Sequence, residues 1–159
     1  MRKDDAVSKD VSPSHLLKRL PFNPEQFLGK GWKIDEQVGR RTGDNLDAGR
    51  IVGKDYLRRW EYNISGEQCL RRIKAKSDVQ LDADDFLALW QENGHVTLKW
   101  LYGTKGITFL SFWGTILRYP FGDRFVLCLD RFGNGSWNCD YYWVDCGSWG
   151  TSRPSSVLA

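Results

Sequence analysis

Trp137-Asn-Cys-Asp-Tyr-Tyr-Trp143 alternates two kinds of side chain. Successive residues of a β-strand point to opposite faces, so odd and even positions form two sets. We expect the odd set to pack into a core: Trp137, Cys139, Tyr141 and Trp143. We expect the even set to face solvent: Asn138, Asp140 and Tyr142. The alternation predicts a half-buried strand over residues 137–145.

Apolar runs separated by glycine-bearing turns predict further strands on the N-terminal side of this one. After Gly94 these runs cover residues 96–102, 107–113, 115–119 and 124–130. Earlier candidates are residues 31–38, 51–52 and 56–62, with a polar loop over 39–49. Gly133-Asn-Gly135 is interpreted as a turn rather than a phosphate-binding loop, because no helix follows it.

Two helices are predicted between these groups of strands. Ser65-Gly-Glu-Gln68 has the form of a capping box, so it marks the start of a short helix. The second helix begins at Asp82, and its apolar face consists of Phe86, Leu89 and Trp90. The aspartates in its first turn suit the helix dipole, which explains them more simply than a metal site does. Together the elements predict an α+β fold with two helices packed on antiparallel β-sheets.

The composition changes abruptly after Lys105. Lys, Glu and Gln fill 20 of the first 105 positions and none of the remaining 54. At the earlier rate about ten would be expected there, and Met and His are missing as well. Aromatic residues, Asp, Asn, Gly, Ser and Arg take their place.

Three explanations of this change remain open. An Asn codon whose two adenines are scrambled reaches Asn, Asp, Tyr, Ser, Gly, Cys or Phe, but never Lys, Glu, Gln, Met or Trp. The tryptophans would then be fixed points between scrambled positions. An ordinary β-rich half would also favour aromatic residues over Lys and Glu, and chance is the third explanation.

Length and charge limit the other possibilities. At 159 residues the chain is expected to form one domain over residues 21–159, preceded by a flexible N-terminal arm over residues 1–20. Residues 110–159 carry four Lys and Arg and four Asp and Glu, so nucleic-acid binding is not favoured. No run is long enough for a membrane span and no secretory signal is visible, which leaves the location open.

Catalytic and metal motifs are not apparent in the sequence. The four cysteines, Cys69, Cys128, Cys139 and Cys146, lack metal-ligand spacing and are interpreted as buried or incidental thiols, although a disulfide stays open. His15 and His95 lie far apart, and scattered aspartates are common in turns. We therefore expect no catalytic residue, no metal and no cofactor.

The order of elements resembles the C-type lectin fold. The C-terminal segment, from Gly114-Thr-Ile-Leu-Arg118 through Trp143-Val-Asp145 to Pro154-Ser-Ser-Val-Leu-Ala159, looks like the variable proteins of diversity-generating retroelements of archaea and candidate-phylum bacteria. In that family a reverse transcriptase scrambles template adenines, and the copy replaces the 3′ end of the gene. The resemblance implies a display protein that binds protein or cell-surface ligands through residues of segment 119–152.

The resemblance also assigns roles to individual positions. Fixed positions would be Leu127, Leu129, Trp137, Trp143, Asp145, Pro154 and Val157-Leu-Ala159, with Trp149 supporting the core as well. Diversified, ligand-binding positions would be Phe125, Asp130, Phe132, Gly133, Ser136, Asn138, Asp140, Tyr141, Tyr142, Cys146, Ser148, Gly150, Thr151 and Ser152. We expect the diversified positions to form one continuous exposed surface. Tyr141 belongs to the diversified set although the alternation places it on the packing face.

Two other functions compete with this one. A calcium-dependent sugar lectin would resemble Trp-Asn-Asp on one strand and a Pro-centred triplet before it, but here Cys139 follows Asn138 and no such triplet occurs. An enzyme of the formylglycine-generating type on the same fold would need reactive cysteines. Neither the ligand nor the oligomeric state follows from the sequence.

Overall fold

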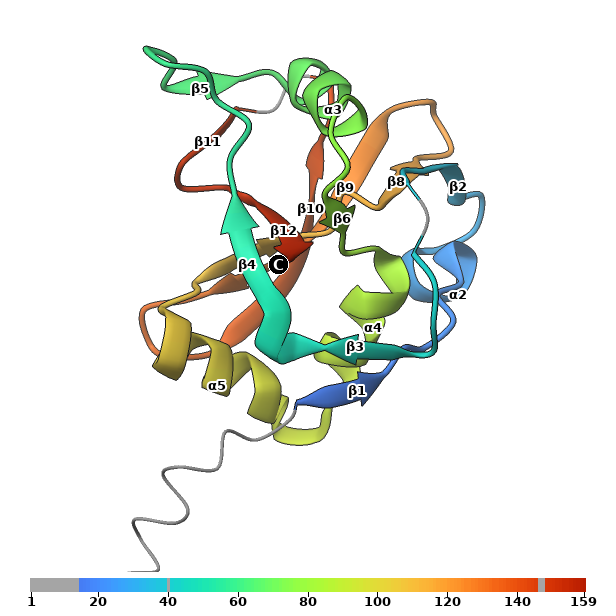
Figure 1. Cartoon of the computed structure of the whole chain (residues 1–159). Coiled ribbons are helices and arrows are strands. Elements are labelled where there is room, and N and C mark those ends of the chain that lie inside the picture. Colours follow the sequence, from blue (N-terminus) through green and yellow to red (C-terminus); the bar gives the residue numbers. More distant parts are fainter. Residues whose placement is uncertain (1–14, 40, 146–147) are drawn as a thin grey trace, which may run out of the picture.

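The computed structural model describes residues 15–39, 41–145 and 148–159, which form a mixed α+β fold (Figure 1). The α-helices of this part of the chain are α2 Pro24–Leu28, α3 Gly66–Lys74, α4 Ala83–Gln91 and α5 Val96–Lys105, and two 3₁₀ turns are η1 Ala48–Arg50 and η2 Asn93–His95. The strands are β1 Leu16–Lys18, β2 Lys33–Gln37, β3 Asn45–Asp47, β4 Ile51–Lys54, β5 Asn63–Ile64, β6 Val79–Gln80, β7 Phe109–Ser111, β8 Thr115–Arg118, β9 Arg124–Arg131, β10 Trp137–Trp143, β11 Trp149–Gly150 and β12 Ser155–Leu158.

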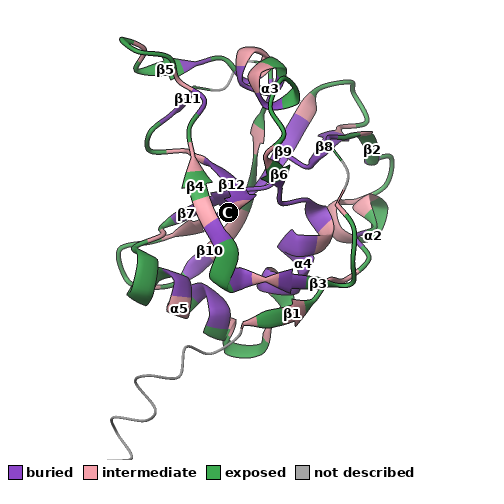
Figure 2. Ribbon diagram, viewed as in Figure 1, coloured by how far each residue is buried: buried purple, intermediate pink, exposed green. Residues whose placement is uncertain are grey.

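The strands form four antiparallel sheets. The largest has the order β10-β9-β8-β2, and β7 also pairs with β9. β9 lies inside this sheet, and its residues Phe125 to Leu129 are buried in succession, so both of its faces are covered. In the other sheets β1 pairs with β3, β11 pairs with β5, and β12 lies between β4 and β6. The buried residues surround β9 and the neighbouring helix α4 (Figure 2).

The predicted helices α3 and α4 are confirmed. The Ser65 hydroxyl accepts a hydrogen bond from the backbone N–H of Gln68, which caps α3. At α4, the Asp82 carboxylate accepts from the N–H groups of Asp84 and Asp85, and the Asp85 carboxylate accepts from the Asp82 N–H. These local bonds satisfy donors that a helix start leaves free, so the sequence alone locates both helix starts.

The predicted strand over residues 96–102 is wrong, because the chain forms α5 there. Its Val, Thr, Trp and Tyr residues favour strands, but the helix buries Thr97, Leu98 and Leu101 on one side. The Glu92 carboxylate accepts hydrogen bonds from the Thr97 N–H at 2.7 Å and from the Thr97 hydroxyl at 2.9 Å. Burial and this terminal bond outweigh the strand preference of the run.

Smaller differences occur in the first half of the chain. Residues 56–62 form no strand, and the expected polar loop over 39–49 contains β3. Residues 16–18 of the expected arm form β1, which pairs with β3, so this part of the arm is attached to the domain. Residues 1–14 lie outside the described residues. In the described ranges, no helix has the length and apolar character that crossing a membrane requires.

Candidate functional site

On one face of the β9–β10 hairpin, β10 and the end of β9 carry polar side chains that reach solvent, whereas Val126 and Cys128 of β9 are buried. Asp130 pairs with Asn138, Cys128 with Asp140 and Val126 with Tyr142. Directly opposed residues of an antiparallel pair share a face, so the even positions of both strands lie together. We call Asp130, Asn138, Asp140 and Tyr142 the polar face. Asp140 is exposed and the other three are partly exposed.

Tyr142 lies at one end of this face and is held by its neighbours. Its hydroxyl donates to Asp130 Oδ2 at 3.0 Å, and the guanidinium of Arg153 lies 4.4 Å from its ring centroid. The ring of Trp149 packs edge-on at 6.2 Å. Burial, followed by the bond to Asp130, raises the pKa of Tyr142 to about 12, so its hydroxyl stays protonated at neutral pH. The hydroxyl proton is thus already donated to Asp130, and the ring offers a positioned contact surface.

The loop over residues 148–152 adjoins the polar face through Arg153. The Arg153 backbone N–H donates to the Gly150 carbonyl at 3.1 Å, and its guanidinium donates to the Ser148 carbonyl at 3.4 Å. Ser148, Thr151 and Ser152 are exposed. Because the same Arg153 lies over Tyr142, the loop and the strand form adjacent parts of one surface.

The turn between β9 and β10 extends this surface at its end. Phe132 is 50% exposed, and Ser136 donates to Asn134 Oδ1 through both its backbone N–H and its hydroxyl. A Cβ atom added at Gly133 would meet no atom within 4 Å. The turn therefore offers room for side chains of any size at this glycine.

The opposite face of β10 carries aromatic side chains, and here the predicted orientations fail in part. Trp143 is 49% exposed instead of buried, whereas Trp137 and Trp149 are buried as expected. Phe125, assigned to the exposed set, is only 7% exposed and lies 5.5 Å from the ring of Trp32. Trp143 lies at the end of the edge strand β10 and pairs with Phe125 of β9. Other side chains cover Phe125 there, but they leave Trp143 half exposed.

Gly150 is the second residue that the structure removes from the exposed set. It is buried, and a Cβ atom there would overlap the backbone oxygen of Tyr62. The cause is the pairing of β11 with β5, which brings Gly150 opposite Asn63. Larger residues cannot fit without moving the backbone.

The structure therefore divides the fourteen predicted positions into four groups. Exposed positions are Phe132, Gly133, Ser136, Asp140, Tyr141, Ser148, Thr151 and Ser152. Partly exposed positions are Asp130, Asn138 and Tyr142, and buried positions are Phe125 and Gly150. Cys146 lies outside the described residues. Tyr141 is 39% exposed, but its ring packs against Trp32 and Phe125 on the other face, so the surface continues around the outer strand rather than over one face.

The two cysteines of the β9–β10 hairpin have raised pKa values. Burial raises the pKa of Cys128 well above its usual value, and burial also raises the pKa of Cys139. Thiols in such surroundings stay protonated and react slowly as nucleophiles. Within residues 15–39, 41–145 and 148–159, no three His, Cys, Asp or Glu side chains lie together as a metal site would require.

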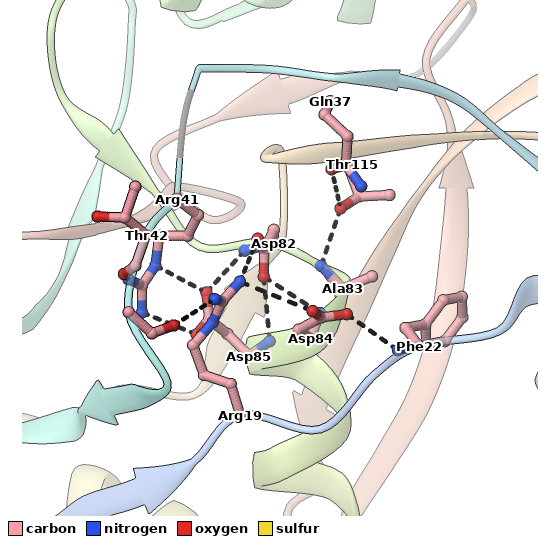
Figure 3. Close-up of polar contacts among 11 residues, drawn as sticks. Arg19, Phe22, Gln37, Arg41, Thr42, Asp82, Ala83, Asp84, Asp85 and Thr115 are labelled. Atoms are coloured by element: carbon pink, nitrogen blue, oxygen red, sulfur yellow. Dashed lines mark hydrogen bonds and ion pairs between the residues drawn. The ribbon is translucent and has the colours of Figure 1, made fainter.

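A second polar cluster lies at the start of α4 (Figure 3). Arg19 donates to Asp82 at 2.5 Å and to Asp85 at 3.0 Å, and Arg41 contacts both oxygens of Asp85. Burial, with the charge of Asp82, raises the pKa of Asp85 to about 6, although both arginines oppose the shift. These carboxylates already cap a helix and hold residues 19 and 41 against it. We interpret the cluster as structural.

One exposed feature was missed at the level of the sequence. Trp60 and Tyr62 were assigned to a strand, but they lie in an irregular loop and are 86% and 90% exposed. The signal available was the sequence Arg58-Arg59-Trp60-Glu61-Tyr62, which joins adjacent arginines to two aromatic residues. Side chains of these types are frequent at binding interfaces.

Comparison of the chain with protein-family models, curated proteins and solved structures found no match.

Proposed function

We propose that this protein is a ligand-binding display protein whose C-terminal residues are diversified by retroelement mutagenesis on a C-type lectin scaffold. The ligand is a protein or a cell-surface molecule. The binding surface consists of the polar face, the 132–136 turn and the exposed residues of the 148–152 loop.

The observation that carries this proposal combines composition with exposure. In the described part of the chain after Lys105, many residues are exposed, yet none is Lys, Glu or Gln. Before that point Lys30, Lys33, Lys99 and other charged residues occupy exposed positions in the usual way. Burial in a β-rich half therefore does not explain the missing residues, whereas scrambled Asn codons would produce this set.

The chemistry of the exposed residues supports a binding role. Tyrosine provides a large contact area with little loss of conformational entropy, and Ser, Gly and Asn provide adaptable hydrogen bonds. The exposed positions lie on an outer strand, a turn and a loop, where substitutions have little effect on a core. The scaffold below them is anchored by the buried β9 and by Trp137 and Trp149.

The C-type lectin scaffold is supported by the order of the elements. Early strands precede α3 and α4, and antiparallel strands follow them. β12 returns to pair with β4, so the end of the described chain lies beside an early strand. The helices α2 and α5 are elements that the resemblance, with its two helices, did not predict.

The alternatives receive less support. An enzyme that depends on a reactive thiol would need a lowered cysteine pKa, but burial raises those of Cys128 and Cys139. A calcium-dependent lectin would need a cluster of oxygen ligands near Asn138, and the sequence around it lacks the required triplets.

The functional test is a pair of displayed libraries. One library randomises exposed or partly exposed surface positions: Phe132, Ser136, Asn138, Asp140, Tyr142, Ser148 and Thr151. The matched library randomises exposed positions elsewhere: Lys18, Glu25, Lys30, Lys33, Gln37, Gln91 and Lys99. Both are selected against hen lysozyme and against streptavidin.

We expect folded, target-specific binders from the first library and few from the second. Equal yields from both libraries, or unfolding of most members of the first, would contradict a dedicated binding surface. The retroelement part has its own test in the DNA beside the gene. A near-copy of the 3′ end that differs at adenines, next to a reverse transcriptase gene, is the expected finding.

A further inference from the structure

The loop Arg58-Arg59-Trp60-Glu61-Tyr62 projects from the body at the upper left of Figure 1, between β4 and β5. Its two aromatic rings are 86% and 90% exposed. Trp60 has φ of 77°, a conformation that bulky residues rarely adopt. Such strained residues persist where the surrounding structure holds them, and they occur often at binding sites.

Glu61 is the residue that holds this loop. Its carboxylate accepts a hydrogen bond from the Arg58 N–H at 2.5 Å and two bonds from the Arg72 guanidinium of α3 at 2.6 and 2.9 Å. The bonds to Arg72 lower the pKa of Glu61 to about 2, so the pair is fully charged at neutral pH. The loop is thereby tied to α3 while Trp60 and Tyr62 stay free to contact another molecule.

A pocket of about 450 Å³ lies at the base of the loop. It is formed by residues 54–58 on one side and by Arg72, Ala75 and Lys76 at the end of α3 on the other. Its one acidic side chain is Asp55, whose Oδ1 accepts the Leu57 N–H. Four of the eight residues that line the pocket are cationic, and the exposed rings of Trp60 and Tyr62 follow its Arg58 in the chain without lining it.

The segment that contains the loop and the pocket residues carries an excess of positive charge. Residues 54–76 contain seven Lys and Arg against three Asp and Glu, which is +4, whereas the whole chain carries +3. Three of the cations are paired internally: Lys54 with Asp78, Arg72 with Glu61 and Lys74 with Glu36. Among the described residues, no ion pair involves Arg58 or Lys76, and both line the pocket.

The guanidinium of Arg59 lies 5.2 Å from the ring centroid of Trp60, so one cation of the loop already contacts an exposed ring. The pocket cations Arg58 and Lys76, together with the exposed rings of the loop, indicate the chemistry of the partner. They match one or two carboxylates followed by apolar or aromatic side chains. A nucleic-acid backbone would instead require a longer track of cations, because its binding depends on several phosphate contacts. An acidic polypeptide segment therefore fits this site better.

We propose that the loop and its pocket form a fixed subsite for an acidic, aromatic-containing segment of a partner polypeptide. A partner carboxylate lies between Arg58 and Lys76, and apolar groups pack on Trp60 and Tyr62. The pairing of β5 with β11 places this subsite beside the 148–152 loop. That the subsite acts together with the diversified surface rests on the proposed function. That the subsite binds acidic segments does not depend on it.

The test measures binding of a fluorescently labelled random copolymer of glutamate and tyrosine by anisotropy at low salt. Trp60→Gly removes the ring and also relieves the positive φ, so loss of folding is not expected. Trp60→Gly and Arg58→Gln should each weaken binding about tenfold. The matched controls are Phe121→Ala, which removes a ring that is 84% exposed, and Lys30→Gln, which removes an exposed cation elsewhere. Both should bind as the parent does.

The inference is overturned if Trp60→Gly and Arg58→Gln bind the copolymer like the parent protein. It is also overturned if the copolymer fails to bind while heparin or oligothymidine binds through the same residues. A further variant replaces Asp140, Tyr142, Ser148 and Thr151, and it should still bind the copolymer with the affinity of the parent protein. If the copolymer test fails but the library selection succeeds, the proposed function stands without the subsite. If the copolymer test succeeds but the library selection fails, the subsite stands without the proposed function.

Discussion

Phe125 and Phe132 provide a direct test of the division between scaffold and surface, because both were predicted from the sequence to be variable. Phe125 is 7% exposed, and its ring lies 4.9 Å from that of Tyr141 and 5.5 Å from that of Trp32. Phe132 is 50% exposed in the turn. Truncation of a buried phenylalanine costs about 3–5 kcal/mol, whereas surface substitutions usually cost no more than about 0.5 kcal/mol.

The assay is urea unfolding of Phe125→Ala and Phe132→Ala, followed by tryptophan fluorescence. With a denaturant dependence of about 2 kcal/mol per molar urea, the midpoint should fall by roughly 1.5–2.5 M for the first and by about 0.3 M or less for the second. Trp143→Ala should fall between them, since half of that ring is already exposed. Equal shifts for the two phenylalanines, or a larger shift for Phe132→Ala, would refute the assignment of Phe125 to the scaffold.

Three further results are expected. Gly150→Ala should lower the melting temperature by several degrees, because its Cβ overlaps the Tyr62 oxygen, while Gly133→Ala should leave it nearly unchanged; similar melting temperatures for both would contradict the steric argument. The pKa of Glu61 is lowered from 4.5 to about 2, so its bond to Arg72 contributes stability above pH 4.5 and loses it as pH falls towards 2. When the free energy of unfolding is measured from pH 4.5 down to pH 2, the Glu61→Gln variant should lose less stability than the parent protein. An equal loss in both proteins would argue against the ion pair. Melting curves with calcium and with a chelator should coincide, as the sequence lacks the Pro-centred triplets, and a drop of several degrees with chelator would reveal a calcium site.

Local signals account for the parts of the fold that were predicted correctly. Ser65 and Asp82 cap α3 and α4 through bonds to residues two or three positions away, so these helices are visible in a short window of sequence. The strand β10 was equally visible from its alternation. By contrast, α5 depends on burial of Leu98 and Leu101 against distant elements, and its run of Val, Thr, Trp and Tyr favours the wrong structure locally.

The surface was only partly predictable for the same reason. Alternation assigns residues to a face but does not reveal how far each end of that face is covered. Phe125 is buried because Trp32, from a remote part of the chain, packs against it. Gly150 is constrained by Tyr62, which becomes its neighbour only when β5 and β11 pair. Tertiary pairing of this kind leaves no mark in the segment itself.

The central position of β12 has a consequence for protein synthesis. β12 follows segment 119–152 in the chain and fills the place between β4 and β6, with Val157 buried there. A ribosome must therefore translate residues 119–152 before this sheet can form. A product that ends before β12, for example after a frameshift, lacks the middle strand and exposes two unpaired edges. Cellular proteases remove unfolded chains of this kind. The fold thus makes accumulation of the protein depend on translation of the chain through β12.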